Sequence, residues 1–208
     1  MSKDTFFDAH QRATVEAAMA RMIPTDHEPG AREARTIDFV ERYLSGIDFI
    51  YARPDGSGFE TLSGKQAQAW RQRVGMLQKT YVEGIAALDA VAKQTFGAPF
   101  KALSERQQDE ALRALERREK GGAGGDGPAL QQTLTETELT FVPLLALHTR
   151  QGFYADPIYG GNGERAGWKV IGFPGPASLM EVFTGRYSAL PWFAEGEEQK
   201  YREANGGE

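Results

Sequence analysis

The sequence predicts a mainly α-helical fold, an irregular domain of about five to six helices with one long central helix. Apolar residues recur at steps of three and four over several segments, as they do on one face of a helix. The clearest pattern runs over residues 66–96, and an extended aromatic, glycine-rich loop region is expected after the last long helix. With 40% hydrophobic and 25% charged residues, the chain can bury a core, and residues 1–208 are expected to form a single domain.

Two amphipathic helices are expected at the start of the chain. Helical spacing predicts the first over residues 5–23, ending before Pro24, and the second over residues 37–47. A polar turn joins them. Within it, Thr25 or Asp26 is expected to cap the second helix.

A loop and the long helix follow. Residues 48–64 contain Pro-Asp-Gly-Ser-Gly between short apolar pieces, which is typical of a loop or small hairpin. A helix over residues 66–96 would be about 45 Å long and would form the spine of the domain. Gly75 and Gly84 lie inside it, so we expect close backbone packing or a bend at these positions.

Charged residues dominate the next segment. Ser104 and Gln107 form a capping box that opens an outer helix, and residues 120–128 are expected to be a flexible loop. The loop contains a G-x-G-x-x-G match that begins at Gly122. A charged helix precedes this match instead of an apolar strand, so no dinucleotide site is expected there.

The last third of the chain is predicted to contain one more long helix, a short helix and a tail. Pro128 suits the first position of a helix that reaches His148, with a kink at Pro143. A short helix is expected over residues 177–184. The polar tail over residues 195–208 is expected to be frayed.

Composition excludes several classes of function. The net charge of −5 and the absence of a basic stripe argue against nucleic-acid binding. The chain has no cysteine, which excludes disulfides, iron–sulfur clusters and thiolate zinc. No apolar run approaches the roughly 20 residues of a membrane span, and we expect no metal site. The N-terminus shows no twin arginine or apolar signal region. We therefore expect a cytoplasmic protein, or a periplasmic one if a signal was removed or is carried by a partner.

Three histidines offer the few candidates for acid–base chemistry. His27 lies between Asp26 and Glu28 in a turn, where the three could form an acid–base cluster or where the turn could simply cap a helix. His148 lies on the apolar stripe of the last long helix, which favours a core or lining residue over a base. No convincing catalytic residue emerges from these patterns.

The segment from Gly152 to Pro176 is unusual because it is rich in glycine and proline and still carries five aromatic residues. Tyrosine and tryptophan are favoured at protein interfaces because they bury a large area and keep a polar tip. The segment could therefore be a docking surface for a partner. It could equally cover the hydrophobic core of its own domain.

The same segment resembles the gluconate 2-dehydrogenase subunit 3 family. The resemblance is carried by Gly-Phe-Tyr-x-Asp-Pro-x-Tyr-Gly-Gly-Asn at residues 152–162, by Gly167-Trp168, and by Ile-Gly-Phe-Pro-Gly at residues 171–175. Arg-Met-Ile-Pro-Thr-Asp at residues 21–26 resembles the other characteristic stretch of the family. The similarity covers most of residues 6–176.

This resemblance implies a small γ subunit of a heteromeric dehydrogenase, without catalytic residues or a cofactor of its own. The FAD would belong to a large flavoprotein subunit of the glucose–methanol–choline (GMC) oxidoreductase type that oxidises a sugar, sugar acid or polyol, with or without a c-type cytochrome subunit. The small chain would serve the assembly, stability or export of that flavoprotein.

The partner interface is expected in the aromatic segment and in the turn after the first helix. Its expected residues are Tyr154, Asp156, Tyr159, Gly160, Gly161, Asn162, Trp168, Phe173, Pro24 and Asp26. Two other functions stay open. One is a stand-alone enzyme that uses Asp26, His27 and Glu28, or His148, and the other is a self-associating structural protein.

Overall fold

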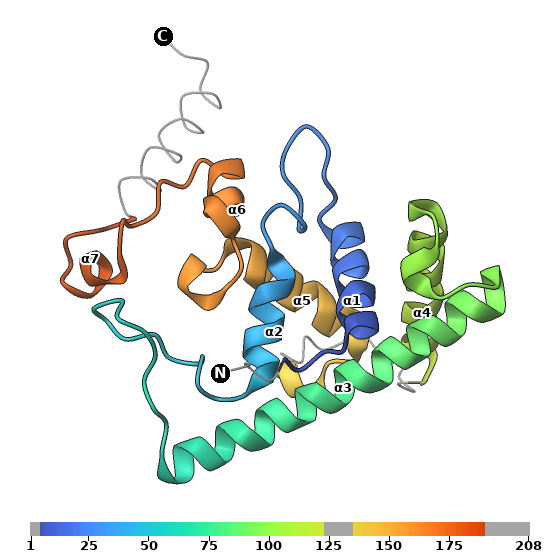
Figure 1. Ribbon diagram of the computed structural model, residues 1–208, viewed down its shortest axis with the longest axis horizontal. Coiled ribbons are helices and arrows are strands. Elements are labelled where there is room, and N and C mark those ends of the chain that lie inside the picture. The colour runs from blue at the N-terminus through green and yellow to red at the C-terminus, as the bar shows by residue number, and fades with distance from the viewer. Residues whose placement is uncertain (1–4, 123–134, 190–208) are drawn as a thin grey trace, which may run out of the picture.

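The computed structural model describes residues 5–122 and 135–189, and these residues form a helical array around one long helix (Figure 1). Helix α3, Gly64–Phe96, has 33 residues, so the predicted spine over residues 66–96 is confirmed. Within the two described ranges the secondary structure is helical apart from one isolated β-bridge. The mainly α-helical fold class is therefore confirmed.

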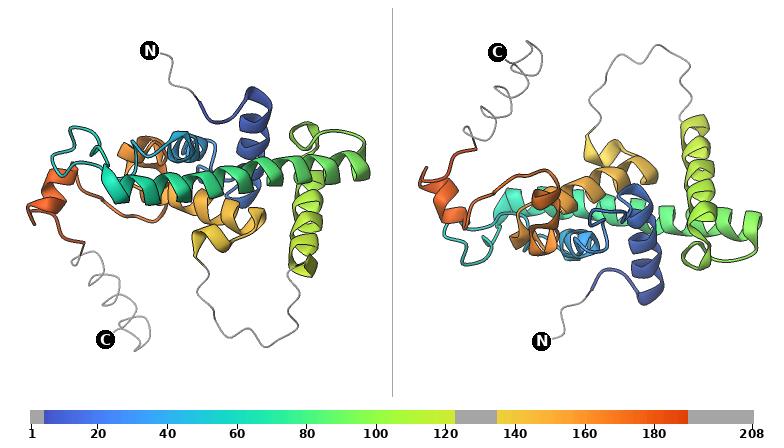
Figure 2. Two further views of the ribbon diagram at one scale, coloured as in Figure 1. Left: turned by 90° about the horizontal axis from the view of Figure 1, so that it is seen from below. Right: turned by 90° about the horizontal axis from the view of Figure 1, so that it is seen from above.

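Helices α1 (Ala9–Met22), α2 (Thr36–Ser45) and α5 (Phe141–Tyr154) lie on one side of α3 and contact it (Figures 1 and 2). Helix α1 begins at a capping box in which Asp8 and Gln11 bond each other's backbone N–H. Residue Arg35, in the left-handed region with φ of 52°, stands at the N-cap of α2. The expectation that Thr25 or Asp26 caps this helix is thus wrong.

The core forms where the apolar faces of these helices meet. One cluster joins α1, α2, α3, α4 and α5, and its fully buried members include Val15, Met19, Val40, Leu44, Leu77, Tyr81, Leu88, Phe100, Leu144 and Leu145. Close packing occurs at Gly84 as predicted, because a Cβ there would lie 2.1 Å from Cγ of Phe141. At Gly75 the expectation of close packing is wrong, since no atom lies within 4 Å of an added Cβ.

Helix α4, Glu105–Gly122, packs against the C-terminal part of α3 as the expected outer helix (Figure 2). The Ser104 backbone N–H donates to Oε1 of Gln107 at 3.0 Å, as the predicted capping pair requires. Before it, the short 3₁₀ helix η1, Phe100–Ala102, turns the chain after α3.

The predicted loop or small hairpin over residues 48–64 is a loop closed by one antiparallel bridge between Ala52 and Phe59. The Arg53 N–H donates to the carbonyl of Gly58 at 2.7 Å and the Glu60 N–H to that of Tyr51 at 2.8 Å.

Within the described residues, the helix predicted over residues 128–148 is interrupted before Phe141. A 3₁₀ turn, η2 (Glu136–Glu138), and an extended Thr140 precede α5, which starts at Phe141. Pro143 therefore lies in the first turn, where its missing N–H has no intrahelical partner to lose, and the predicted kink is wrong.

Several predicted features lie outside the described residues. These are most of the loop over residues 120–128 with Gly124 and Gly127, the start of the helix at Pro128, and the tail over residues 195–208.

Four short helices follow α5: η3 (Pro157–Tyr159), η4 (Gly163–Arg165), α6 (Ala166–Val170) and α7 (Leu179–Phe183). The short helix expected over residues 177–184 is confirmed by α7. Among the helices described in residues 5–122 and 135–189, none has the combination of length and apolar character needed to cross a bilayer.

Candidate functional site

The two stretches that carry the family resemblance lie side by side in the fold. The Gly163 N–H donates to the carbonyl of Ala34 at 2.8 Å, which ties the aromatic segment to the turn before α2. Ala34, Phe153 and Ala166 form a buried apolar cluster of their own, with Ile23 and Val170 packed against it. Residues about 130 positions apart in the sequence therefore build one structural unit, which we call the motif unit (residues 21–36 and 152–176).

Gly161 and Gly167 of the motif unit admit no side chain because the backbone of α5 passes directly over them. A Cβ at Gly161 would lie 2.1 Å from the carbonyl oxygen of Gly152. At Gly167 it would lie 2.0 Å from the carbonyl oxygen of Phe153. Both distances are far below contact, so a larger residue would force the segment off α5.

Asn162 and Trp168 hold the aromatic segment in place from inside. Asn162 has a φ of 49° and no exposed surface; its amide donates to the Ala155 carbonyl at 2.9 Å and accepts from the Gly167 N–H at 2.8 Å. The indole N–H of Trp168 donates to the carbonyl of Tyr154 at 2.7 Å, and its ring meets Phe173 edge-on at 5.4 Å.

The expected interface residues thus divide into three groups by burial. Buried in the motif unit are Gly161, Asn162 and Trp168; partly buried are Asp156, Tyr159, Gly160 and Phe173; exposed are Tyr154, Pro24 and Asp26. Asp156 accepts the N–H of Ile158 at 2.9 Å and so caps η3. The buried group shapes the surface from within, and only the other residues can touch a partner directly.

The turn at residues 24–28 is open to solvent and does not form an enclosed cluster. The His27 side chain is 86% exposed, with Nδ1 3.4 Å from Oδ1 of Asp26. Asp26 uses that same oxygen to accept the Glu28 N–H at 2.9 Å, so it caps its own turn.

His148 is completely buried and belongs to a polar network that crosses the core. Its Nε2 lies 2.5 Å from Oε1 of Glu136, and its Nδ1 lies 3.0 Å from the hydroxyl of Tyr81, whose ring stacks on the imidazole. With Nε2–H donating to the carboxylate, Nδ1 accepts from the Tyr81 hydroxyl. The sequence-based interpretation of His148 as a satisfied core residue agrees with this position.

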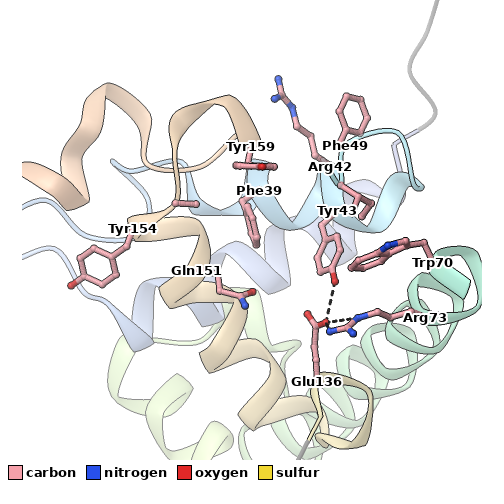
Figure 3. Close-up of a pocket in the computed structure, with 12 residues that line it drawn as sticks. Phe39, Arg42, Tyr43, Phe49, Trp70, Arg73, Glu136, Gln151, Tyr154 and Tyr159 are labelled. Atoms are coloured by element: carbon pink, nitrogen blue, oxygen red, sulfur yellow. Dashed lines mark hydrogen bonds and ion pairs between the residues drawn. The ribbon is translucent and has the colours of Figure 1, made fainter. Parts of the chain in front are cut away.

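The other oxygen of Glu136 faces a tyrosine and an arginine (Figure 3). Oε2 accepts from the Tyr43 hydroxyl at 3.0 Å and from Nε of Arg73 at 2.9 Å, with a second bond from Nη2 of Arg73. We call Tyr43, Arg73, Tyr81, Glu136 and His148 the Glu136 network; they come from α2, α3, η2 and α5.

Burial acts to raise the pKa of Glu136, but hydrogen bonds from His148, Arg73 and Tyr43 outweigh it and lower the pKa to about 2. Burial and the nearby carboxylate raise the pKa of Tyr43 and of Tyr81. At neutral pH the network therefore contains an ionised carboxylate paired with an arginine, and two neutral phenols.

A pocket of about 530 Å³ opens beside this network. It is lined by Phe39, Arg42, Tyr43, Phe49, Ile50, Trp70, Arg73, Glu136, Gln151, Tyr154, Ala155 and Tyr159 (Figure 3). Tyr154 and Tyr159 are the two predicted interface residues that reach it. The fully buried His148 does not line the pocket, but it bonds Glu136 and contacts the rings of Phe39 and Tyr43, which do.

The patterns in the sequence did not single out Glu136, Arg73 or Tyr43. None of the three belongs to a recognisable sequence motif, and Glu136 and Arg73 are 63 residues apart. Only the fold brings them together. Among the described residues, no group of three or more His, Cys, Asp or Glu side chains could hold a metal ion.

Comparison with known proteins gives one match. The family model described as Gluconate 2-dehydrogenase subunit 3 matches residues 9–175, a range that contains nearly the whole motif unit and the complete Glu136 network. No curated protein and no solved structure matches the chain.

Proposed function

The chain belongs to the gluconate 2-dehydrogenase subunit 3 family, and we propose that it is the non-catalytic small subunit of a heteromeric, FAD-dependent dehydrogenase. In this proposal the large subunit is a flavoprotein of the GMC type. It holds the FAD and oxidises a hydroxyl group of a sugar, sugar acid or polyol. A c-type cytochrome subunit can complete the complex.

The observation that carries this proposal is the motif unit. The family match extends over both of its stretches, and in the structure they are tied by the Gly163–Ala34 hydrogen bond and by a shared apolar cluster. Glycines that admit no side chain and a fully buried asparagine fix the backbone of this unit. A rigid, irregular surface of this kind suits recognition of a partner, because little conformational entropy is lost on binding.

Exposed apolar residues in the motif unit and on the neighbouring α7 supply the anchors that such an interface needs. Tyr154 is 41% exposed and Ile171 is 42% exposed. On α7, Phe183 is 70% exposed. Aromatic and aliphatic side chains of this size contribute most when a partner covers them completely.

The proposed role is to assist the assembly, stability or export of the large subunit. A chain that binds only the folded state of a partner shifts that partner's folding equilibrium by mass action. The complex would work in the cytoplasm, or in the periplasm if a signal was removed or is carried by the partner.

Co-expression with a GMC-type flavoprotein from the same organism tests the proposal. We expect a tag on the small chain to recover a yellow complex with flavin absorbance and sugar-dependent dye reduction. Omitting the small chain should remove most of the soluble flavoprotein. A colourless chain recovered alone, as a monomer or a homodimer, would contradict the proposal and would favour the stand-alone enzyme or the self-associating protein.

Two substitutions separate docking from folding. Tyr154→Ala removes an exposed ring and should weaken the complex while leaving the unfolding of the isolated chain nearly unchanged. Trp168→Ala removes a buried ring and should destabilise the isolated chain itself by about 3 kcal/mol. Equal recovery of the flavoprotein by wild type and Tyr154→Ala would exclude Tyr154 as an anchor.

A further inference from the structure

The pocket beside the Glu136 network has the features of a small-molecule site, and we propose that it binds an organic carboxylate that carries a flat ring or carbon face. Its volume of about 530 Å³ lies within the range of about 300–1,000 Å³ that is usual for such sites. This inference does not rest on the proposed subunit function, although the pocket shares Tyr154 with the proposed interface.

Aromatic side chains make up half of the pocket lining. They are Phe39, Tyr43, Phe49, Trp70, Tyr154 and Tyr159. Several of these rings are held by neighbours in the same wall: Phe39 meets Tyr43 with centroids 6.1 Å apart, and Arg73 lies 5.2 Å from the Trp70 ring centroid. Rings fixed in this way offer faces and edges on which a flat ligand can stack.

The charges in the pocket favour an anion. The charged lining residues are Arg42, Arg73 and Glu136, so the formal charge is two positive and one negative, or +1 in total. Arg73 and Glu136 neutralise each other through their hydrogen bonds. Arg42 is therefore the lining charge that is available to pair with an anionic ligand.

Arg42 is positioned to receive a carboxylate. Its Nη1 donates to the carbonyl of Ile158 at 2.7 Å, and its guanidinium carbon lies 5.6 Å from the centroid of the Phe49 ring. These contacts orient the guanidinium group. Within residues 5–122 and 135–189, no Asp or Glu lies at ion-pair distance from Arg42, and the guanidinium fork matches the two oxygens of a carboxylate.

The two ends of the pocket also fix the orientation of the ligand. Figure 3 shows Arg42 and Glu136 at opposite ends of the labelled residues, with the Arg42 side chain extending away from Glu136 and with Tyr43 between the two. The ionised Glu136 repels a second anion from its own end. A ligand carboxylate is therefore expected at Arg42, with the uncharged body lying toward Tyr43 and Trp70.

Titration of the full chain with three probes, followed by calorimetry or ligand-observed NMR, tests this proposal. Benzoate supplies a carboxylate on an aromatic ring, gluconate supplies one on a polyol, and benzamide lacks the charge. We expect saturable binding of benzoate. Gluconate should bind more weakly because its open polyol chain offers no flat face to the aromatic rings, and binding of gluconate without benzoate would contradict the proposal. Benzamide should bind about tenfold more weakly than benzoate.

Arg42→Gln should weaken binding of benzoate about tenfold and leave benzamide binding unchanged. The matched control is Arg32→Gln, at an exposed arginine that does not line the pocket, and it should bind the acid as the wild type does. The circular dichroism spectrum and unfolding midpoint of each variant would show that it is folded. The proposal is overturned if benzoate does not bind saturably or if both variants bind the acid equally well.

Discussion

The turn at residues 26–28 and the Glu136 network contain the same kinds of side chain, acids beside a histidine, in opposite settings. In the turn the three residues are consecutive, and the His27 side chain is 86% exposed. In the network the partners come from four elements, and His148 has no exposed surface. Proximity in sequence produces a solvated cluster, whereas the fold produces a desolvated one whose electrostatic interactions are much stronger.

Removing the carboxylate of Glu136 should lower the free energy of unfolding far more than a change in the turn at residues 26–28. Glu136→Ala leaves the buried His148 and Tyr43 without their acceptor and Arg73 without its anion, so we expect a loss of about 3 kcal/mol in the free energy of unfolding. Arg73 recovers part of its hydration because its side chain is 40% exposed. Urea unfolding followed by circular dichroism measures the effect.

The matched control is His27→Ala in the exposed turn. It should change the free energy of unfolding by no more than about 0.5 kcal/mol. Similar losses for the two variants would mean that burial does not distinguish the two clusters.

Packing behind the network gives the next largest effect. Gly84 meets Phe141, whose ring lies edge-on to Tyr81 at 5.6 Å. Gly84→Ala should therefore displace Phe141 and cost about 2 kcal/mol of unfolding free energy.

Gly75→Ala on the same helix is its control, since an added Cβ there meets nothing within 4 Å. It should stabilise the chain by up to about 1 kcal/mol, because alanine favours the helix more than glycine does. A stabilising Gly84→Ala substitution, measured by thermal unfolding, would disprove the close contact.

Acidification should remove the contribution that the ionised Glu136 makes to stability. The pKa of Glu136 is lowered from 4.5 to about 2, so the stability that its ionised form contributes is complete above about pH 5 and is lost as the pH falls towards 2. We expect Glu136→Gln to show a flatter decline in unfolding midpoint than the wild type across this interval. Parallel curves for the two proteins would show that Glu136 titrates normally.

Local patterns in the sequence predicted the elements whose stability is encoded locally. The apolar stripe predicted a helix over residues 66–96, and α3 begins only two residues earlier, at Gly64. Ser104 predicted the start of α4, which begins at Glu105. The segment before α5 was predicted as helix, but its turn is set by Thr135, whose backbone and hydroxyl both bond Glu138. A short-range cap of this kind competes with the helical pattern that the apolar residues suggested.

The candidate site was less predictable because its residues meet only in the folded chain. Asn162 and Trp168 were predicted as interface residues, but the structure buries both, because Asn162 bonds the carbonyl of Ala155 and Trp168 that of Tyr154 at the end of α5. The partners of His148 could not be found by spacing, since Tyr81 is 67 residues away. The Glu136 network could therefore be identified only from the structure, whereas the family motif could be recognised in the sequence.

The central claim is that this chain works as a subunit bound to a flavoprotein. Native mass spectrometry of the complex recovered through a tag on the small chain tests it most directly. The account predicts one species whose mass equals the small chain plus a flavoprotein and its FAD, and which loses abundance when Tyr154 is replaced by alanine. A spectrum that contains only the 22.9 kDa chain or its homodimer, with soluble flavoprotein present in the same cells, would contradict it.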